Sequence, residues 1–323
     1  MVSGTAVRNA DEALPRAVWT ECRAVLTAAG IENAGQELDW MWENVFGQGR
    51  HLTDPAAPLP PQEVSRLRQM VEQRAQHRPL QYLLGSWPFL DFELRVAPGV
   101  LIPRADTECV ALHAVECGRR FFDKAQRDGE ASAGAASENG PSVTPSADEA
   151  LRCIDLCAGS GAIALALAVR LGRPVTAVEL SDAALPLLRE NVRRVCAKAA
   201  VPSVTVVQAD IFAYQETLPD GCVGLLTANP PYLTAQEMSA LQPEVAFEPA
   251  MALDGGADGL DFYRHIVTAY RRCMAPGGTL VLEIGETQGT AVCTLLTENG
   301  WQDVRLLQDA AGLDRCVSAV RRG

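Results

Sequence analysis

Residues 153–168 read CIDLCAGSGAIALALA, and this stretch decides the fold class of the chain. An apolar run with the length of a buried strand passes through Gly159-Ser160-Gly161 into an alanine-rich segment with a helical composition. Glycine lets the backbone approach a ligand closely, and the first N–H groups of a helix are free to bind one. The stretch therefore predicts a ligand-binding turn between a strand and a helix. A GxG turn also fits a dinucleotide site, although Ala164 at the third glycine position of that fingerprint argues against NAD.

Short apolar runs continue after this stretch and alternate with helical segments. This alternation is typical of a parallel, doubly wound sheet with helices on both faces, whose ligands lie beyond the carboxyl ends of the strands. The sequence therefore predicts an α/β fold. The seven expected strands are 151–157, 175–179, 204–210, 223–228, 279–284, 304–307 and 316–320.

The part of the chain before this sheet has two other patterns. Apolar residues recur at helical spacing and are interrupted at Gly30, at Gly47 and at the Pro60-Pro61 pair, which predicts a small helical domain over residues 1–84. Alternating residues then predict a β-hairpin linker over 85–105, with Pro98-Gly99 as its turn.

The predicted α/β domain spans residues 106–323 and contains one segment of low complexity. A helix is expected near 107–122. Residues 124–149 are dominated by Gly, Ala, Ser, Glu and Pro, and such a composition buries too little apolar surface to order itself. We therefore expect a flexible insertion at 124–149.

Composition narrows the classes of partner and the compartment. The 323 residues carry a formal net charge of −12, the opposite sign to that favoured by phosphate backbones, so we expect no direct nucleic-acid partner. The ten cysteines form no CxxC pair, which predicts reduced thiols and neither disulfides nor a metal site. There is no signal-peptide pattern and no apolar run of about 20 residues, so we expect a cytoplasmic protein with no membrane contact.

Two acidic residues at expected strand ends extend the ligand site. Glu179 lies 20 positions after Gly159, where a carboxylate can bind the hydroxyl groups of a ribose, although it could equally cap a helix. Asp210 and Ile211 follow the next strand, where an acid can reach an adenine amino group and an apolar side chain can cover the ring. Together with the glycine turn, these residues favour a cofactor that contains adenosine.

The most specific signal is Asn229-Pro230-Pro231-Tyr232 at the end of the fourth expected strand. Two prolines make a rigid turn and remove two backbone donors, which leaves acceptors and an aromatic face. The Asn229 side-chain oxygen and the Pro230 carbonyl can each accept one N–H of a planar NH2 group, and Tyr232 can pack against its plane. The nitrogen lone pair is then directed at a methyl donor. An exocyclic amine of a flipped nucleobase would fit the same turn.

The chain resembles the bacterial peptide chain release factor glutamine methyltransferases (the HemK/PrmC family) over most of residues 60–323. The residues that carry the resemblance are RPLQYLLGSWPF from Arg78, VLIPRADTE from Val100, DLCAGSGAIALALA from Asp155, NPPY from Asn229, FEPAMALDGGADGL from Phe247 and LEIGETQ from Leu282. The resemblance implies a seven-stranded, Rossmann-like class I methyltransferase domain behind a helical substrate-docking domain. It also implies S-adenosylmethionine as the cofactor, with no metal.

The resemblance further implies the substrate and the residue roles. The family methylates the side-chain amide of the glutamine in the Gly-Gly-Gln motif of class I release factors, and we expect this chain to do so as a monomer. The catalytic residues would be Asn229, Pro230 and Tyr232, and the same turn with Pro231 would bind the substrate. The cofactor would contact Cys157, Ala158, Gly159, Ser160, Gly161, Glu179, Asp210, Ile211 and Asn229.

Some positions depart from the family pattern, and alternatives remain. Ala105 and Ala158 replace a usual proline and threonine, Glu179 replaces Asp, and Ile211 is less suited than an aromatic residue to stack on adenine. Glu248 and Pro249 are expected to buttress the pocket. Arg104 supports either the cofactor region or an ion pair with Asp106 or Glu108. The alternative functions are glutamine methylation of a ribosomal protein and, less favoured, N6-methylation of adenine in nucleic acid.

Overall fold

The computed structural model describes residues 14–133 and 151–322, and the side chains of 128–133 are not considered further. The chain divides into two compact units. The helical unit comprises the described residues up to Ser86 together with Gln242–Phe247, and the sheet unit comprises Trp87–Leu241 and the described residues from Glu248 onward. The two units are therefore divided at different points from the predicted domains, because six residues from the second half of the chain belong to the helical unit.

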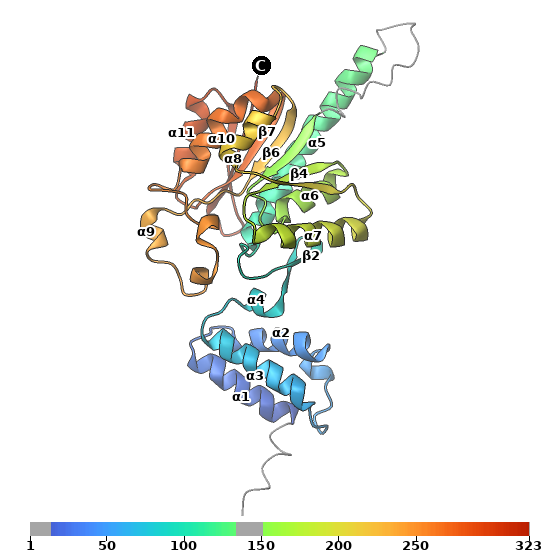
Figure 1. Ribbon diagram of the computed structural model, residues 1–323, viewed down its shortest axis with the longest axis vertical. Coiled ribbons are helices and arrows are strands. Elements are labelled where there is room, and N and C mark those ends of the chain that lie inside the picture. Colours follow the sequence, from blue (N-terminus) through green and yellow to red (C-terminus); the bar gives the residue numbers. More distant parts are fainter. Residues whose placement is uncertain (1–13, 134–150, 323) are drawn as a thin grey trace, which may run out of the picture. The chain divides into compact units, whose positions relative to one another are not determined.

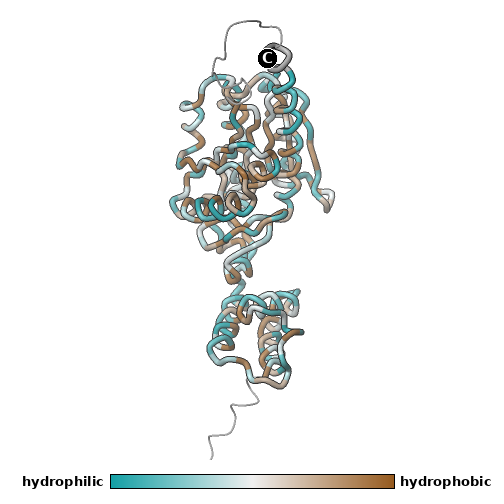
Figure 2. The backbone as a smooth tube through the Cα atoms, turned by 90° about the vertical axis from the view of Figure 1, so that its right-hand side faces the viewer, coloured by the Kyte–Doolittle hydropathy of each residue, from teal (hydrophilic) through white to brown (hydrophobic). Residues whose placement is uncertain are grey.

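The helical unit consists of α1 (Pro15–Ala28), α2 (Ala34–Phe46), α3 (Pro61–Ala75) and α4 (Leu80–Leu84). Its helices are amphipathic, and Figure 2 shows hydrophilic and hydrophobic segments following one another along each of them. Gly47 and Gly85 end α2 and α4 with φ angles of 71° and 75°, which glycine adopts without steric cost. The fully buried side chains of its core are Val18, Leu26, Leu38, Met41, Trp42 and Leu67.

An ion cluster holds Gln242–Phe247 within the helical unit. The Arg74 side chain on α3 is 4% exposed, and its Nε lies 2.5 Å from Glu37 Oε2. Its Nη2 lies 2.6 Å from Glu244 Oε1. A buried guanidinium needs such partners, because an unpaired charge in an apolar interior is costly.

The sheet unit is built on seven strands in the order β5-β4-β3-β6-β7-β9-β8. Figure 1 labels β4, β6 and β7 of this sheet. The first five are parallel neighbours, and β9 is antiparallel to both β7 and β8. Strand order reverses between β3 and β6, which is where an open α/β sheet binds its ligand. The strands are β3 (Arg152–Leu156), β4 (Val175–Glu179), β5 (Val204–Gln208), β6 (Val223–Ala228), β7 (Met274–Glu283), β8 (Gln302–Gln308) and β9 (Asp314–Val320).

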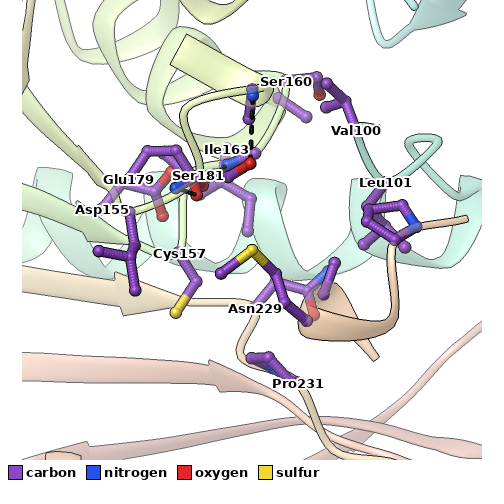
Figure 3. Close-up of a pocket in the computed structure, with 18 of the residues that line it drawn as sticks. Val100, Leu101, Asp155, Cys157, Ser160, Ile163, Glu179, Ser181, Asn229 and Pro231 are labelled. Atoms are coloured by element: carbon purple, nitrogen blue, oxygen red, sulfur yellow. Dashed lines mark hydrogen bonds between the residues drawn. The ribbon is translucent and has the colours of Figure 1, made fainter. Parts of the chain in front are cut away.

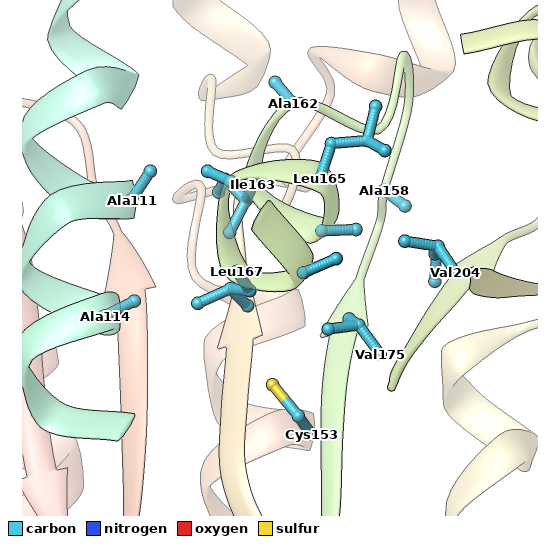
Figure 4. Packing of buried hydrophobic residues seen from close by; sticks show 14 of the residues in the cluster. Ala111, Ala114, Cys153, Ala158, Ala162, Ile163, Leu165, Leu167, Val175 and Val204 are labelled. Atoms are coloured by element: carbon cyan, nitrogen blue, oxygen red, sulfur yellow. The ribbon is translucent and has the colours of Figure 1, made fainter. Parts of the chain in front are cut away.

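Helices cover both faces of this sheet and bury two apolar clusters (Figure 1). Helices α5 and α6 lie beside each other on one of these faces, and Figure 4 shows Ile163 and Leu167 of α6 on the side that faces Ala111 and Ala114 of α5. The helices of one face are α5 (Ala105–Ala133), α6 (Ala162–Leu171) and α7 (Ala184–Ala199). Those of the other are α8 (Ile211–Tyr214), α10 (Asp261–Ala269) and α11 (Gly289–Glu298). The connections contain α9 (Ala235–Met238) and the 3-10 turns η2 (Arg50–Leu52), η3 (Gln215–Thr217), η4 (Val245–Phe247), η5 (Ala250–Ala252) and η6 (Arg271–Cys273).

The predicted α/β fold with seven strands, a preceding helical region and a hairpin is confirmed. Two local predictions are wrong. The hairpin of β1 (Ser86–Phe89) and β2 (Phe92–Arg95) closes at Leu90-Asp91, with Leu90 at a φ of 50°. Pro98-Gly99 makes a separate turn after β2. A leucine in the left-handed position gives no turn signal in the sequence, whereas Pro-Gly gives a strong one.

The second error concerns the insertion predicted at 124–149. Helix α5 continues to Ala133, so residues 124–133 are helical. Their sequence, KAQRDGEASA, is rich in Ala, Lys, Gln, Arg and Glu, which propagate a helix that has already begun. The remainder of the predicted insertion, from residue 134 to 149, lies outside the described residues. Within the described parts of the chain, no helix has the length and apolarity needed to cross a membrane.

Candidate active site

A pocket lies beyond the carboxyl ends of β3, β4 and β6, at the reversal of strand order. Figure 3 shows Asp155, Cys157, Glu179 and Asn229 around it, with Val100 and Leu101 on the far side. The predicted cofactor and substrate residues that line it are Cys157, Ala158, Gly159, Ser160, Glu179, Asp210, Ile211, Asn229 and Pro231. Gly161, Pro230 and Tyr232 do not line it.

The two glycines of the turn have different roles, because Gly159 faces the pocket and Gly161 supports the turn from behind. Gly159 has a φ of 54°, and a Cβ there would meet no atom within 4 Å, so its backbone is open to a ligand. Gly161 has a φ of 90°, and a Cβ there would lie 2.6 Å from Leu188 Cδ1. Gly161 therefore lets α6 start close to α7, while Gly159 gives access to the backbone.

Glu179, at the end of β4, is tied to the glycine turn. Its Oε2 accepts the Gly159 N–H at 2.7 Å, and its Oε1 accepts the Ser181 N–H at 2.8 Å. Each carboxylate oxygen has a second lone pair available to a ligand. The carboxylate is therefore fixed at the rim of the pocket before any ligand binds.

The end of β5 supplies a capping acid and an apolar wall. Asp210 is the N-cap of α8, and its Oδ1 accepts the Phe212 N–H at 2.9 Å. Ile211 is buried and lines the pocket beside Phe262. Phe262 also contacts Phe212, with ring centroids 5.2 Å apart. The aromatic residue of this wall thus comes from α10, which the sequence reasoning did not identify.

The segment 100–104, which reads VLIPR, forms the opposite wall of the pocket through Val100, Leu101 and Arg104. The buried carboxylate of Glu248 accepts the Ile102 N–H at 3.0 Å and forms an ion pair with Arg104. Arg104 therefore pairs with Glu248, and the alternative prediction of an ion pair with Asp106 or Glu108 is wrong. Glu248 lies 144 residues away from Arg104, so spacing in the sequence could not reveal the pair.

The NPPY turn follows β6 directly. Asn229 is half-buried and lines the pocket with Pro231, whereas Tyr232 lines a neighbouring cavity of about 410 Å³. Desolvation of the Tyr232 hydroxyl, with a smaller contribution from the charge of Glu283, raises its pKa to about 12. The phenol is thus neutral at physiological pH.

The backbone of Tyr232 is held by two later segments. Gln288 Nε2 donates to the Tyr232 carbonyl at 2.9 Å and to the Gly259 carbonyl at 3.2 Å. A Cβ on Gly259 would lie 2.3 Å from the Tyr232 oxygen, and one on Gly255 would lie 2.7 Å from its Cα. Gly255 and Gly259 are therefore required for this close approach.

Asp155 is a pocket residue for which the sequence reasoning assigned no role. It is 1% exposed, and it accepts the Thr227 hydroxyl at 2.6 Å and the Ala164 N–H at 3.1 Å. Desolvation raises its pKa to about 7 despite these two hydrogen bonds. The feature of the sequence that could have identified Asp155 as a pocket residue is its place in the DLCAGSGA segment.

The chemistry of the pocket is that of binding and orientation. Its lining is mostly apolar, with a fixed carboxylate at Glu179 and an amide at Asn229. Desolvation raises the pKa of the Cys157 thiol well above its usual value, so this thiol is not ionised as a nucleophile would need to be. Within the described residues, no group of three or more His, Cys, Asp or Glu could hold a metal ion.

Known proteins resemble both parts of the chain. A family model described as the PrmC N-terminal domain matches residues 17–85, and one described as Conserved hypothetical protein 95 matches residues 143–253. A release factor glutamine methyltransferase from Geobacter sulfurreducens is 37% identical over 93% of this chain and 93% of its own length. One from Moorella thermoacetica is 36% identical over 92% of this chain and 95% of its own length.

A solved structure is also similar in sequence. It is the release factor-specific protein-(glutamine-N5) methyltransferase from Alicyclobacillus acidocaldarius, at 26% identity and a TM-score of 0.34. The match covers 71% of this chain and 100% of that one. With relatives more than 30% identical over nearly its whole length, this chain belongs to the release factor glutamine methyltransferase family.

Proposed function

We propose that this methyltransferase uses S-adenosylmethionine and methylates the side-chain amide nitrogen of the glutamine in the Gly-Gly-Gln motif of class I release factors. The observation that carries the proposal is the position of Asn229. It lines the same pocket as the Gly159 turn and the fixed Glu179 carboxylate. An amide acceptor for the substrate therefore lies next to groups suited to an adenosine ligand.

The residues present fit the cofactor. Gly159 exposes its backbone to the pocket, and the free lone pairs of Glu179 suit ribose hydroxyls. Ile211 and Phe262 give an apolar wall for adenine, with Asp210 beside them for its amino group. Cys157, Ala158, Ser160 and the Gly161-supported turn would hold the methionine end. When bound, S-adenosylmethionine supplies a methyl group activated by its sulfonium.

The NPPY turn would hold the amide that receives the methyl group. The Asn229 side-chain oxygen and the Pro230 carbonyl accept its two N–H groups, and Pro231 offers no competing backbone donor. Tyr232 packs against the plane of the amide. A carboxamide nitrogen is a weak nucleophile, so the contribution of these residues is orientation, exclusion of water and stabilisation of developing charge. As the new N–C bond forms, the bond between the methyl carbon and the sulfonium sulfur would break, S-adenosylhomocysteine would be left as the product, and one N–H proton would pass to water.

The substrate is a folded protein, and we infer that the chain acts on it in the cytoplasm as a monomer, with no nucleic acid or metal required. The net charge of −12 supports a protein substrate over a polyanion.

A methyl-transfer assay with radiolabelled S-adenosylmethionine tests the proposal. Parallel reactions contain a class I release factor, the same factor with its Gly-Gly-Gln glutamine changed to alanine, ribosomal proteins, and DNA. We expect label only on the intact release factor. Label on a ribosomal protein or on DNA would overturn the assignment of the substrate.

A further inference from the structure

Glu283 lies directly beside Asn229 at the carboxyl edge of the sheet. Strands β6 and β7 are parallel neighbours, with Ala228 opposite Leu282. The residues that follow them in the chain, Asn229 and Glu283, therefore lie side by side. Glu283 is 1% exposed. Among the described residues its Oε2 has no hydrogen-bond partner, and neither has the buried hydroxyl of Thr107 on α5.

In the described parts of the chain, no basic side chain forms an ion pair with this carboxyl group. The charge of Arg315, on the adjacent β9, influences it, but the Arg315 guanidinium is engaged by Asp309 at 3.3 Å and Asp106 at 3.6 Å. Burial raises the pKa of Glu283 to about 7, and the side chain of Thr107, the charge of Arg315 and the side chain of Asn229 partly oppose this rise. The other titratable groups that sense its charge are Tyr232, Tyr263, Cys109 and Cys316.

A buried carboxylate with one oxygen left without a hydrogen-bond partner is expensive, and an apolar residue at the end of β7 would avoid the cost. The carboxylate has a property that the Asn229 side chain needs. An amide has a donor end and an acceptor end of almost the same shape, whereas an ionised carboxylate only accepts hydrogen bonds. A carboxylate beside Asn229 therefore selects the rotamer in which Nδ2 faces Glu283 and Oδ1 faces away from it.

We propose that Glu283 is a positioning residue for methyl transfer, whose ionised carboxylate orients Asn229 so that its Oδ1 accepts an N–H of the substrate amide. The inference rests on the proposed role of Asn229. It gives a function to a residue of the LEIGETQ segment that does not line the cofactor pocket. The same negative charge stabilises the positive charge that develops on the substrate nitrogen.

The test compares wild type with Glu283→Gln, using whichever acceptor the wild type methylates. A neutral amide at this position can present either end to Asn229, so kcat should fall roughly 10- to 100-fold, the usual range for losing a charged hydrogen bond. KM for the acceptor and the calorimetric Kd for S-adenosylmethionine should change less than about threefold. Glu298→Gln, an exposed residue of α11, is the matched control and should match wild type.

The pH profile separates positioning from packing. Wild-type kcat should rise with pH to a plateau above about pH 7, as Glu283 ionises. In Glu283→Gln this rise should disappear. Asp155 also has a pKa raised to about 7, and a rise caused by Asp155 would persist in the variant. A persistent rise, or a wild-type kcat in the variant, would overturn the proposal.

Thermal stability gives a readout that does not depend on activity. A carboxyl whose pKa is raised by folding stabilises the fold fully below its unfolded pKa of 4.5, and this contribution is lost as the pH rises through 7. Glu283→Gln should therefore melt increasingly higher than wild type between pH 4.5 and pH 7.5. A variant that is less stable at every pH would assign Glu283 a purely structural role. A wild type that does not label release factors would refute only the proposed substrate.

Discussion

The departure of Glu179 from the aspartate usual in this family has a structural explanation at the scale of one residue. Its extra methylene lets one carboxylate oxygen reach the Gly159 N–H while the other accepts the Ser181 N–H. Two backbone donors hold the group at the pocket rim, so little side-chain entropy remains to be lost on binding a ligand. The longer side chain is therefore compatible with the proposed ribose contact.

Replacing Asn229 tests the turn at the same scale. Asn229→Ala should lower kcat by a factor on the order of 100 to 1000, because the substrate amide loses one of its two acceptors. The fold should persist, since the side chain is half-buried and faces a pocket. Single-turnover methyl transfer and circular dichroism measure the two effects. Wild-type turnover in a folded variant would contradict the role of Asn229.

At the scale of elements, the catalytic turn depends on segments far along the chain. Tyr232 has its carbonyl bound by Gln288 and its backbone pressed against Gly255 and Gly259. The loop before α10 and the N-cap residue of α11 thus act together as a support for the NPPY turn. A defect in this support should displace Tyr232 without touching the cofactor pocket.

Gly259→Ala tests that support. The added Cβ would lie 2.3 Å from the Tyr232 oxygen, and the backbone has a φ of 74°. We expect a loss of about 2 to 3 kcal/mol in unfolding free energy and at least a tenfold lower kcat, because the turn must shift. Gly312→Ala is the matched control, since Gly312 has a φ of 81° with nothing within 4 Å of its Cβ position. The Gly312→Ala variant should lose about 1 kcal/mol of unfolding free energy and keep the wild-type kcat. Equal losses in both variants would contradict the support.

At the scale of the whole molecule, the two units should differ in how they depend on Arg74. Arg74→Met keeps most of the side-chain volume but leaves Glu37 and Glu244 without their cation. We expect the unfolding free energy of the helical unit to fall by about 2 to 3 kcal/mol. This is less than the full value for a buried ion pair, because both glutamates are partly exposed. Binding of S-adenosylmethionine to the sheet unit should be unchanged.

Urea unfolding followed by tryptophan fluorescence measures this loss, because three of the five tryptophans, Trp19, Trp40 and Trp42, belong to the helical unit. The matched control is Arg68→Met, whose ion pair with Glu21 is exposed on both sides. It should change the unfolding free energy by less than about 1 kcal/mol. Weaker cofactor binding in Arg74→Met would contradict the independence of the two units.

The sequence predicted those structural features that depend on a local pattern of residues. The expected strands 175–179 and 223–228 match β4 and β6, because apolar runs bounded by turn residues are visible without the fold. The glycine turn, Glu179 and Asn229 fall around one pocket because parallel strands end at a common edge. Their ligand contacts remain predictions.

What the sequence did not predict depends on tertiary contacts. Arg104 finds its partner at Glu248, and Phe262 joins Ile211 from another helix. The buried carboxyl of Glu283 is a neighbour of Asn229 only because β6 and β7 are paired. Strand pairing and ion pairs over such sequence distances leave no trace in spacing.

The inclusion of Gln242–Phe247 in the helical unit has a consequence for protein engineering. A fragment cut after Ser86 would carry Arg74 without Glu244, and therefore an incomplete set of charges. Exchanging the helical unit between relatives would require grafting both segments together. Evolution faces the same restriction, because a single crossover at the apparent domain boundary would separate a cation from one of its anions.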